Sequence, residues 1–386
     1  MLKDHISTII ISMFAIVTGV MASLEFREMH HPEPLFPSKG LTGKGMLSDY
    51  FEGIKGTNGD TEVYFFDSGE PGATVFLAGG THPNEPAGYM AGVVILENLI
   101  PEKGRVIIIP RLNNSGFTCT DPMEAYPQSF HVETDGGPRR FRVGSRGTNP
   151  LDQWPDPLVY VHKQSGQQYS GIDSRNLNRA YPGKPDGSLT EKVAYAIVKL
   201  IEKERADISF DLHEAAPEIP IINAIVYHER AEDIAMYAIL DLEMEGLHYA
   251  PELSPKNFRG LSHREWGDFT QTNPFLMETS SPLQGRLRGK TTEELVLEGF
   301  SPNYQTAKET GALRITYRDE GEQLRHRVGR HLSGFQAILR AYTDIHPDKP
   351  IVVSGLPDYQ DLVTKGLGHY LNSNQSIPDT EGSEHN

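Results

Sequence analysis

The order strand, helix, strand over residues 74–110 constrains the fold more than any other feature of the chain. Residues 74–78 are a short β-prone run, and residues 87–100 carry apolar side chains at helical spacing. Residues 105–110, Arg-Val-Ile-Ile-Ile-Pro, form a continuous apolar run typical of a strand buried on both faces. Because a helical crossover joins parallel strands, we expect a parallel sheet covered by helices.

Other segments extend this pattern along the chain. Their apolar spacing predicts a helix at 191–205 and strands at 208–212, 221–227 and 274–277. Residues 62–67 precede a Gly-Glu-Pro-Gly turn and are expected to pair with 74–78 as a hairpin or as adjacent strands. The sequence therefore predicts an α/β fold with a mixed, mostly parallel central sheet flanked by helices.

The chain divides into segments of different character. Residues 23–57 are rich in Pro, Gly and His and are expected to form an extended arm over the domain surface. The main α/β domain is predicted at 58–300. Residues 301–371 are expected to form a mainly helical C-terminal extension, and 372–386 are predicted to be a disordered tail.

Residues 6–22 are seventeen residues without a charge. That length is at the short limit for a bilayer of about 30 Å, and Val20-Met21-Ala22 before Ser23 offers a small-residue cleavage position. We expect residues 1–22 to be a secretory signal and the protein to be exported, either periplasmic or extracellular. A retained N-terminal anchor and a buried helix are the alternatives, and contact with a membrane is expected only for the anchor.

Charge and cysteine content limit the partners and the metal ligands. The formal net charge of −16 opposes binding to a phosphate backbone, so we do not expect nucleic acid as a partner. A single cysteine, Cys119, excludes an internal disulfide framework and any thiolate zinc cluster. Fifteen histidines remain available, so a metal site must use nitrogen and oxygen ligands.

Candidate ligands follow two of the predicted strands. His82 and Glu85 come after the strand at 74–78 and a Gly-Gly turn, where the carboxyl ends of parallel strands form ligand sites. Taken alone, this pair is better explained as a surface histidine beside a helix-capping glutamate. His213 ends the strand at 208–212 and brings a second imidazole to the same edge. Two histidines and one glutamate would bind one zinc ion and leave a fourth position open, as in hydrolytic sites.

Glu278 closes the apolar run at 274–277 and has the profile of a general base. A strand would bring its carboxylate from half-buried surroundings to the carboxyl edge of the sheet. The alternative is a carboxylate that pairs with Arg286 or Arg288.

The segment 136–183 carries seven cations against three Asp residues in an otherwise acidic chain. Arginine clusters at such a site favour an anionic substrate. Arg179, next to Asn178, is expected to bind a substrate carboxylate, and either Arg175 or Arg146 would stabilise an oxyanion. We expect Arg139, Arg140 and Arg142 to pair with acidic residues instead.

Four motifs, taken in order, resemble those of the succinylglutamate desuccinylase and aspartoacylase family, which belongs with the zinc carboxypeptidases. They are His82-Pro83-Asn84-Glu85, the run Asn-Leu-Asn-Arg-Ala-Tyr-Pro-Gly at 176–183, Asp211-Leu212-His213 and Met277-Glu278-Thr279. The resemblance covers about residues 60–300. It implies zinc ligands at His82, Glu85 and His213, a carboxylate-binding pair Asn178-Arg179 and a catalytic Glu278.

The sequence departs from this family at two motif positions and at the C-terminus. Pro83 stands where the family has Gly, and Asn176 where it has Asp. The β-rich C-terminal domain of several members is not expected, because residues 300–371 read as mostly helical. His326 and His331, five residues apart on a predicted helix, are expected to be surface residues.

Three functions fit these patterns. The leading one is a zinc-dependent amidohydrolase, a deacylase that cleaves the amide bond of a small anionic N-acyl amino acid. The alternative is an exported metallocarboxypeptidase that acts on short or cell-wall peptides with the same zinc chemistry. A binding protein that keeps the metal site without turnover is the third, and the presence of Glu278 argues against it.

Overall fold

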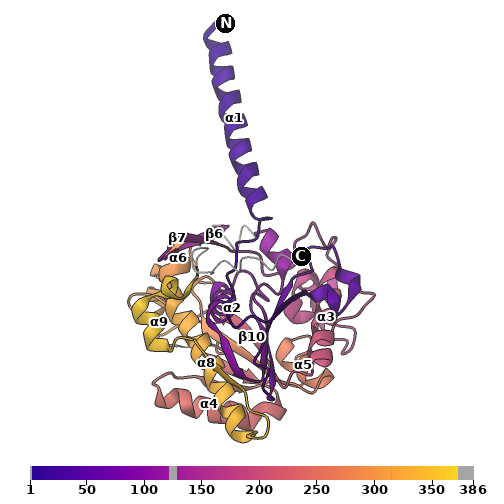
Figure 1. The fold of residues 1–386 in the computed structure, drawn as a ribbon. Coiled ribbons are helices and arrows are strands. Elements are labelled where there is room, and N and C mark those ends of the chain that lie inside the picture. Colours follow the sequence, from indigo (N-terminus) through magenta and orange to yellow (C-terminus); the bar gives the residue numbers. More distant parts are fainter. Residues whose placement is uncertain (1, 121–127, 314, 373–386) are drawn as a thin grey trace, which may run out of the picture.

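The computed structural model describes residues 2–120, 128–313 and 315–372, and it contains one large sheet (Figure 1). Eight strands pair in the order β1–β2–β5–β3–β10–β13–β11–β12. The four central strands are parallel: β5 (Arg105–Ile109), β3 (Thr74–Ala78), β10 (Ile208–Ala215) and β13 (Asn273–Ser280). The outer strands are β1 (Gly43–Met46), β2 (Glu62–Asp67), β11 (Ala224–Tyr227) and β12 (Ala250–Leu253). The predicted mixed, mostly parallel sheet is confirmed.

Helices cover both faces of this sheet, as Figure 1 shows. Those on one face are α2 (Pro86–Asn98), α4 (Glu232–Met244) and α8 (Leu324–Ile345); those on the other are α3 (Leu189–Glu204) and α5 (Ser262–Phe269). Along β3, Val75 and Leu77 face the first layer while Phe76 and Ala78 face the second, because side chains alternate along a strand. Burial on both faces explains why the central strands read as continuous apolar runs.

The predicted pairing of residues 62–67 with 74–78 is wrong. β5 lies between the two segments, and it pairs antiparallel with β2 and parallel with β3. The connection from β2 to β3 therefore crosses β5 and does not form a hairpin. The place of β5 between β2 and β3 gives the backbone of this apolar strand hydrogen-bond partners along both edges.

The N-terminal region is a long helix followed by a segment built into the domain. Helix α1 (Leu2–Glu28) runs past the predicted boundary at residue 22 and leaves the domain surface (Figure 1). The arm expected at 23–57 is only partly extended over the surface, because β1 forms the edge strand of the large sheet next to β2. Met29 is fully buried at the end of α1.

The C-terminal region is mainly helical, as predicted, and it shares the main core. It contains α7 (Pro302–Glu309), α8, α9 (Tyr359–Lys365) and a short strand β14 (Val352–Ser354), which pairs with β4 (Ile100–Lys103). Side chains of α8 lie in the same apolar cluster as those of α2 and α4. The boundary expected at residue 300 therefore does not separate two cores. The predicted tail, apart from Asn372, lies outside the described residues.

The remaining elements are small and lie outside the large sheet. One hairpin consists of β6 (Ser129–Thr134) and β7 (Gly137–Arg142), a second of β8 (Val159–Val161) and β9 (Gln168–Ser170), and α6 (Glu293–Glu298) precedes α7. The arginines of β7 pair with acids, as expected: Arg139 with Glu97, Arg140 with Glu28 and Arg142 with Glu33.

Glu33 joins the N-terminal segment to the core. Arg142 Nε donates to Glu33 Oε2 at 2.7 Å, and Arg111 Nη1 donates to the Glu33 carbonyl at 3.0 Å. The hydroxyl of Tyr89, in α2, donates to Glu33 Oε1. Burial by itself would raise the pKa of Glu33, but the charges of Arg142 and Arg111 hold this pKa below its ordinary value.

We predict that Glu33→Gln lowers the free energy of unfolding by about 3–5 kcal/mol, because it leaves buried arginine charge uncompensated. In the wild type this stabilisation is complete above the unfolded-state pKa of about 4.3 and is lost as the pH falls through the lower folded-state pKa. Urea unfolding between pH 7 and pH 3 measures both effects. Glu28→Gln is the control, because Glu28 is 55% exposed and its pair with Arg140 is 3.4 Å long. Equal stability of the two variants at pH 7 would contradict the prediction.

Candidate metal centre

The turn after β3 sets the position of the first two predicted ligands. Gly80 has a φ of +67°, and a Cβ there would lie 2.9 Å from the ring of Phe117, so the close approach requires glycine. The chain then places His82 and Glu85 before Pro86, which starts α2. Proline at the first helical position lacks an N–H that would have no partner there.

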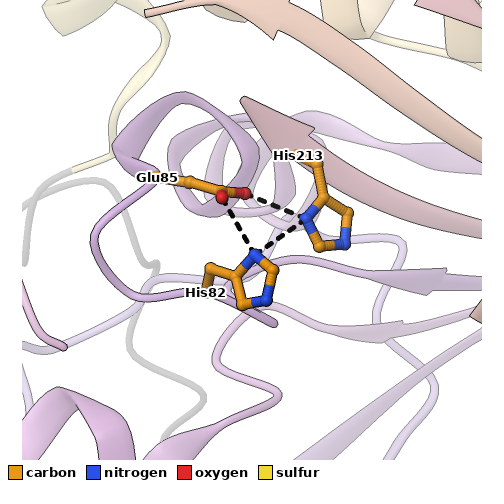
Figure 2. A group of neighbouring side chains, drawn as sticks. All are labelled: His82, Glu85 and His213. Atoms are coloured by element: carbon orange, nitrogen blue, oxygen red, sulfur yellow. Dashed lines mark hydrogen bonds and ion pairs between the residues drawn. The ribbon is translucent and has the colours of Figure 1, made fainter. Parts of the chain in front are cut away.

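Three predicted ligands converge at the carboxyl edge of the sheet (Figure 2). His82 Nδ1 lies 2.9 Å from Glu85 Oε1, and His213 Nδ1 lies 2.9 Å from Glu85 Oε2. The two Nδ1 atoms are 3.1 Å apart. All three side chains are buried, with at most 2% exposed.

The Nε2 atom of each imidazole points away from the other ligands and lies close to a side-chain oxygen. His82 Nε2 lies 2.9 Å from Asn176 Oδ1, an atom that also accepts a hydrogen bond from the Asn178 backbone N–H. The Asn176 amide nitrogen donates to Asp173, which fixes the direction of the amide. His213 Nε2 lies 2.9 Å from Asp211 Oδ2. The Asn176 oxygen favours the proton of His82 on Nε2 and leaves its Nδ1 lone pair facing the other ligands, whereas Asp211 contacts His213 Nε2 as an ion-pair partner without hydrogen-bond geometry.

This arrangement fits a divalent cation. Lone pairs 3.1 Å apart beside a carboxylate repel one another unless positive charge lies among them. Two nitrogens on a tetrahedral zinc ion would lie about 3.3 Å apart, given bond lengths of roughly 2.0–2.1 Å. In the metal-free protein a proton on His213 supplies this positive charge. Burial opposes protonation, but the carboxylates of Asp211 and Glu85 raise the pKa of His213 well above its ordinary value. Burial lowers the pKa of His82 to about 4.

Glu278 lies beside the three ligands on the next strand. It is the register partner of His213 in the parallel pair of β10 and β13. Its Oε2 is buried and has no hydrogen-bond partner among the residues that the structure describes, which opposes the alternative of a carboxylate neutralised by arginine. Burial raises the pKa of Glu278 to about 8, with the charges of His213 and Arg146 acting in the opposite direction.

Of the predicted arginines, Arg146 and Arg179 lie near the ligands. Arg146 Nη1 donates to Glu85 Oε1 at 2.7 Å. The Arg179 guanidinium lies over the rings of Tyr169 and Phe258, 5.6 and 5.2 Å from their centroids. Burial, and then the charge of Arg146, lower the pKa of Arg179. Two cations, Arg146 and Arg179, therefore lie in the same region. Among the residues that the structure describes, no carboxylate forms an ion pair with Arg179.

Asn178 and Arg175 have structural contacts that the sequence did not indicate. The Asn178 side-chain oxygen accepts a hydrogen bond from Ser262 N, at the start of α5. Arg175 donates from Nε and Nη2 to Asp156 and from Nη1 to the Thr148 carbonyl. These bonds hold the loop, so the structure does not bring the Arg175 guanidinium to the ligands as we expected. Arg146 is the arginine that contacts them.

Several residues near the centre were missed or misplaced by sequence reasoning. His331 is fully buried and His326 is 9% exposed, so both predicted surface histidines belong to the interior. His331 contacts Thr279 of β13, whereas His326 packs against Tyr359 at the start of α9. His263, in α5, is buried beside Ser254, and burial, with the charge of His213 acting in the same direction, lowers its pKa to about 3. A lone histidine in an amphipathic helix carries no sequence signal for such a position.

We predict that Asn176→Leu weakens divalent-cation binding about 10- to 100-fold, because His82 loses the acceptor that orients it. Asn176→Asp keeps an oxygen in place and should bind at least as tightly as the wild type. Isothermal titration of Zn²⁺ into chelator-treated protein measures both affinities, and circular dichroism verifies that both variants are folded. Unchanged affinity in folded Asn176→Leu would show that the amide does not orient His82.

Comparisons with known proteins agree with the motifs. Residues 163–256 match the family model described as the succinylglutamate desuccinylase/aspartoacylase catalytic domain. A curated relative, the N-alpha-acetyl-L-2,4-diaminobutyric acid deacetylase of Halomonas elongata, is 28% identical over 159 residues, which are 41% of this chain and 33% of the relative. The chain therefore matches about a third of the length of this relative.

Two solved structures illustrate the structural matches. A succinylglutamate desuccinylase/aspartoacylase from Rhodobacter sphaeroides has 18% identity and a TM-score of 0.35, over 68% of this chain and 64% of that one. The tripeptide-bound cell shape determinant Csd4 from Helicobacter pylori has 12% identity and a TM-score of 0.46, over 79% of this chain and 59% of that one. The family model supports the resemblance predicted from the motifs: the matched residues 163–256 include two of the four motifs, the run at 176–183 and Asp211-Leu212-His213.

Proposed function

We propose that the protein is a zinc-dependent hydrolase that removes the acyl group from a small anionic N-acyl amino acid. The observation that carries this proposal is the convergence of His82, Glu85 and His213, with Glu278 next to His213 on the adjacent strand. Two imidazoles and one carboxylate are a ligand set of catalytic zinc sites, which keep one position open. A closed structural site would require a fourth protein ligand.

His82, Glu85 and His213 would hold the zinc ion. When bound, zinc polarises a carbonyl and lowers the pKa of water, which is the chemistry that amide hydrolysis requires. Glu278 would accept the proton of the attacking water and return it to the leaving nitrogen. Burial raises the pKa of Glu278 in the metal-free protein, and the positive charge of a bound zinc ion would lower it toward the range in which the carboxylate accepts a proton. Arg146, half-exposed beside Glu85, would stabilise negative charge on the carbonyl oxygen.

Arg179 and Asn178 would bind the free carboxylate of the substrate. The Arg179 guanidinium lies against two aromatic rings, and its Nη1 donates to the Asn178 carbonyl. It has no carboxylate partner in the described part of the chain, so its remaining donors would be available to an anion. Arg146 adds a second positive charge to the same region. This charge favours small anionic amides. The C-terminal carboxylate of a peptide has the same chemistry, so a carboxypeptidase is the competing function.

We predict metal-dependent hydrolysis of N-acetyl-aspartate, N-succinyl-glutamate or a similar N-acyl amino acid, abolished by chelator and restored by zinc. Glu278→Gln should keep one zinc per chain and lose about 10²–10⁴-fold in kcat, because the proton acceptor is gone. The release of amine measures turnover, and elemental analysis measures bound zinc. The control is His131→Ala, because the His131 side chain is 47% exposed. Release from short peptides alone would favour the carboxypeptidase, and zinc uptake without any turnover would favour a binding protein.

We also propose that the protein is exported and that residues 1–22, which include most of α1, are its signal. His5–Glu28 is apolar enough and long enough to cross a membrane, with a mean hydropathy of 2.1, and none of it is buried in the protein. The described contacts of this region with the domain begin at Glu28, which pairs with Arg140, and continue at Met29. Cleavage after Ala22 would therefore leave every one of these contacts in place.

We predict a mature protein that begins at Ser23 and is recovered outside the cytoplasm, because Ala22 supplies the small residue that a signal peptidase requires. Intact mass and N-terminal sequencing of the fractionated protein measure this directly. Ala22→Leu should retain the full-length mass. Full-length wild-type protein in the membrane fraction after a carbonate wash would show instead that α1 is a retained anchor.

A further inference from the structure

Arg327 is a fully buried arginine of α8, outside all the motifs of the metal centre. Its Nη1 donates to Glu214 Oε1 at 2.5 Å, and the Arg327 side chain is 1% exposed. Its other nitrogens donate to backbone carbonyls, Nε to Glu322 at 2.9 Å and Nη2 to Val296 at 2.5 Å. Three separate segments therefore fix the orientation of this guanidinium.

Glu214 connects Arg327 to the metal ligands. It follows His213 at the end of β10, and its Oε2 accepts a hydrogen bond from the Ala87 backbone N–H at 2.8 Å, in the first turn of α2. The Glu214 backbone N–H donates to Glu85 Oε2 at 3.0 Å. A single residue thus ties the strand that carries His213 to the turn that carries Glu85.

Helix α8 also reaches the segment that carries Glu278. Arg327 Nη1 lies 3.4 Å from Ser281 Oγ, directly after β13. His331, one helical turn beyond Arg327, has its Nε2 3.3 Å from Thr279 Oγ1, and Thr279 is adjacent to Glu278. One face of α8 therefore contacts the ends of both strands from behind the metal centre.

We infer that the buried pair of Arg327 and Glu214 positions His213 and Glu85 for the metal ion, so that the C-terminal helix is part of the metal centre. This inference rests on the proposed zinc site. A buried ion pair in which both partners are fully hydrogen-bonded has one arrangement, and removal of one partner leaves a charge that must find another. Residues that orient metal ligands typically change metal affinity 10- to 100-fold when they are substituted.

The test is the zinc affinity of Arg327→Met and Arg327→Lys, measured by competition with a chromophoric chelator on full-length protein. We expect zinc binding 10- to 100-fold weaker for Arg327→Met and a smaller loss for Arg327→Lys, which keeps a charge for Glu214 but loses the planar fork. The absorption spectrum of the cobalt-substituted protein should change in both variants, because it reports the ligand geometry. If Arg327→Met does not fold, Arg327→Lys decides the outcome alone.

Two control variants on the same helix separate positioning from general stability. Arg340→Met breaks an exposed pair with Asp241, and Leu339→Ala opens a cavity about three turns further along α8. Both should bind zinc like the wild type, although Leu339→Ala lowers the melting temperature. Wild-type affinity in folded Arg327→Lys, or equal losses in Leu339→Ala, overturns the inference. A wild type that takes up no zinc overturns the proposed function together with it.

Discussion

Two imidazole nitrogens, His82 Nδ1 and His213 Nδ1, are held 3.1 Å apart with both oxygens of Glu85 beside them. Electron pairs at that distance repel one another, so the arrangement persists only with positive charge among them. The rest of the structure supplies the forces that keep the three groups together. A hydrogen bond to Asn176 orients the ring of His82, and the Asp211 carboxylate lies 2.9 Å from His213 Nε2. His213 projects from the buried strand β10, and His82 lies in the turn between β3 and α2.

Two buried arginine–carboxylate pairs join the two terminal regions of the chain to the core. Arg142 and Glu33 join the N-terminal segment to α2 near its start, through Tyr89. Arg327 and Glu214 join the C-terminal helix to β10 at its end. Both terminal regions look like appendages in the sequence, yet each supplies one partner of a buried pair. Buried arginine–carboxylate pairs add little to the stability of the fold, because the cost of desolvating the two charges offsets most of their attraction. Their main effect is to select one packing arrangement of the segments that they join.

Part of this architecture could be predicted from local patterns. The central parallel strands, the helices around them and the C-terminal helix have apolar periodicities that depend on short segments alone. The wrong predictions share a physical cause: each depended on what lies across the sheet or across the core. β2 and β3 are close in sequence, yet β5 pairs with both. Arg175 is next to a motif, yet Asp156 occupies its guanidinium, and His331 is on a polar-looking helix, yet it is buried against Thr279.

The sequence alone determined which side chains are available as ligands and on which strand ends they lie, because strand patterning and residue type are local properties. It also excluded thiolate chemistry, since the chain has one cysteine. Only the tertiary structure decided which nitrogen of each imidazole faces the centre, which arginine contacts Glu85 and which helix braces His213. Those outcomes depend on distances between segments more than a hundred residues apart, such as Glu214 and Arg327, and no local pattern encodes the competition among their possible partners.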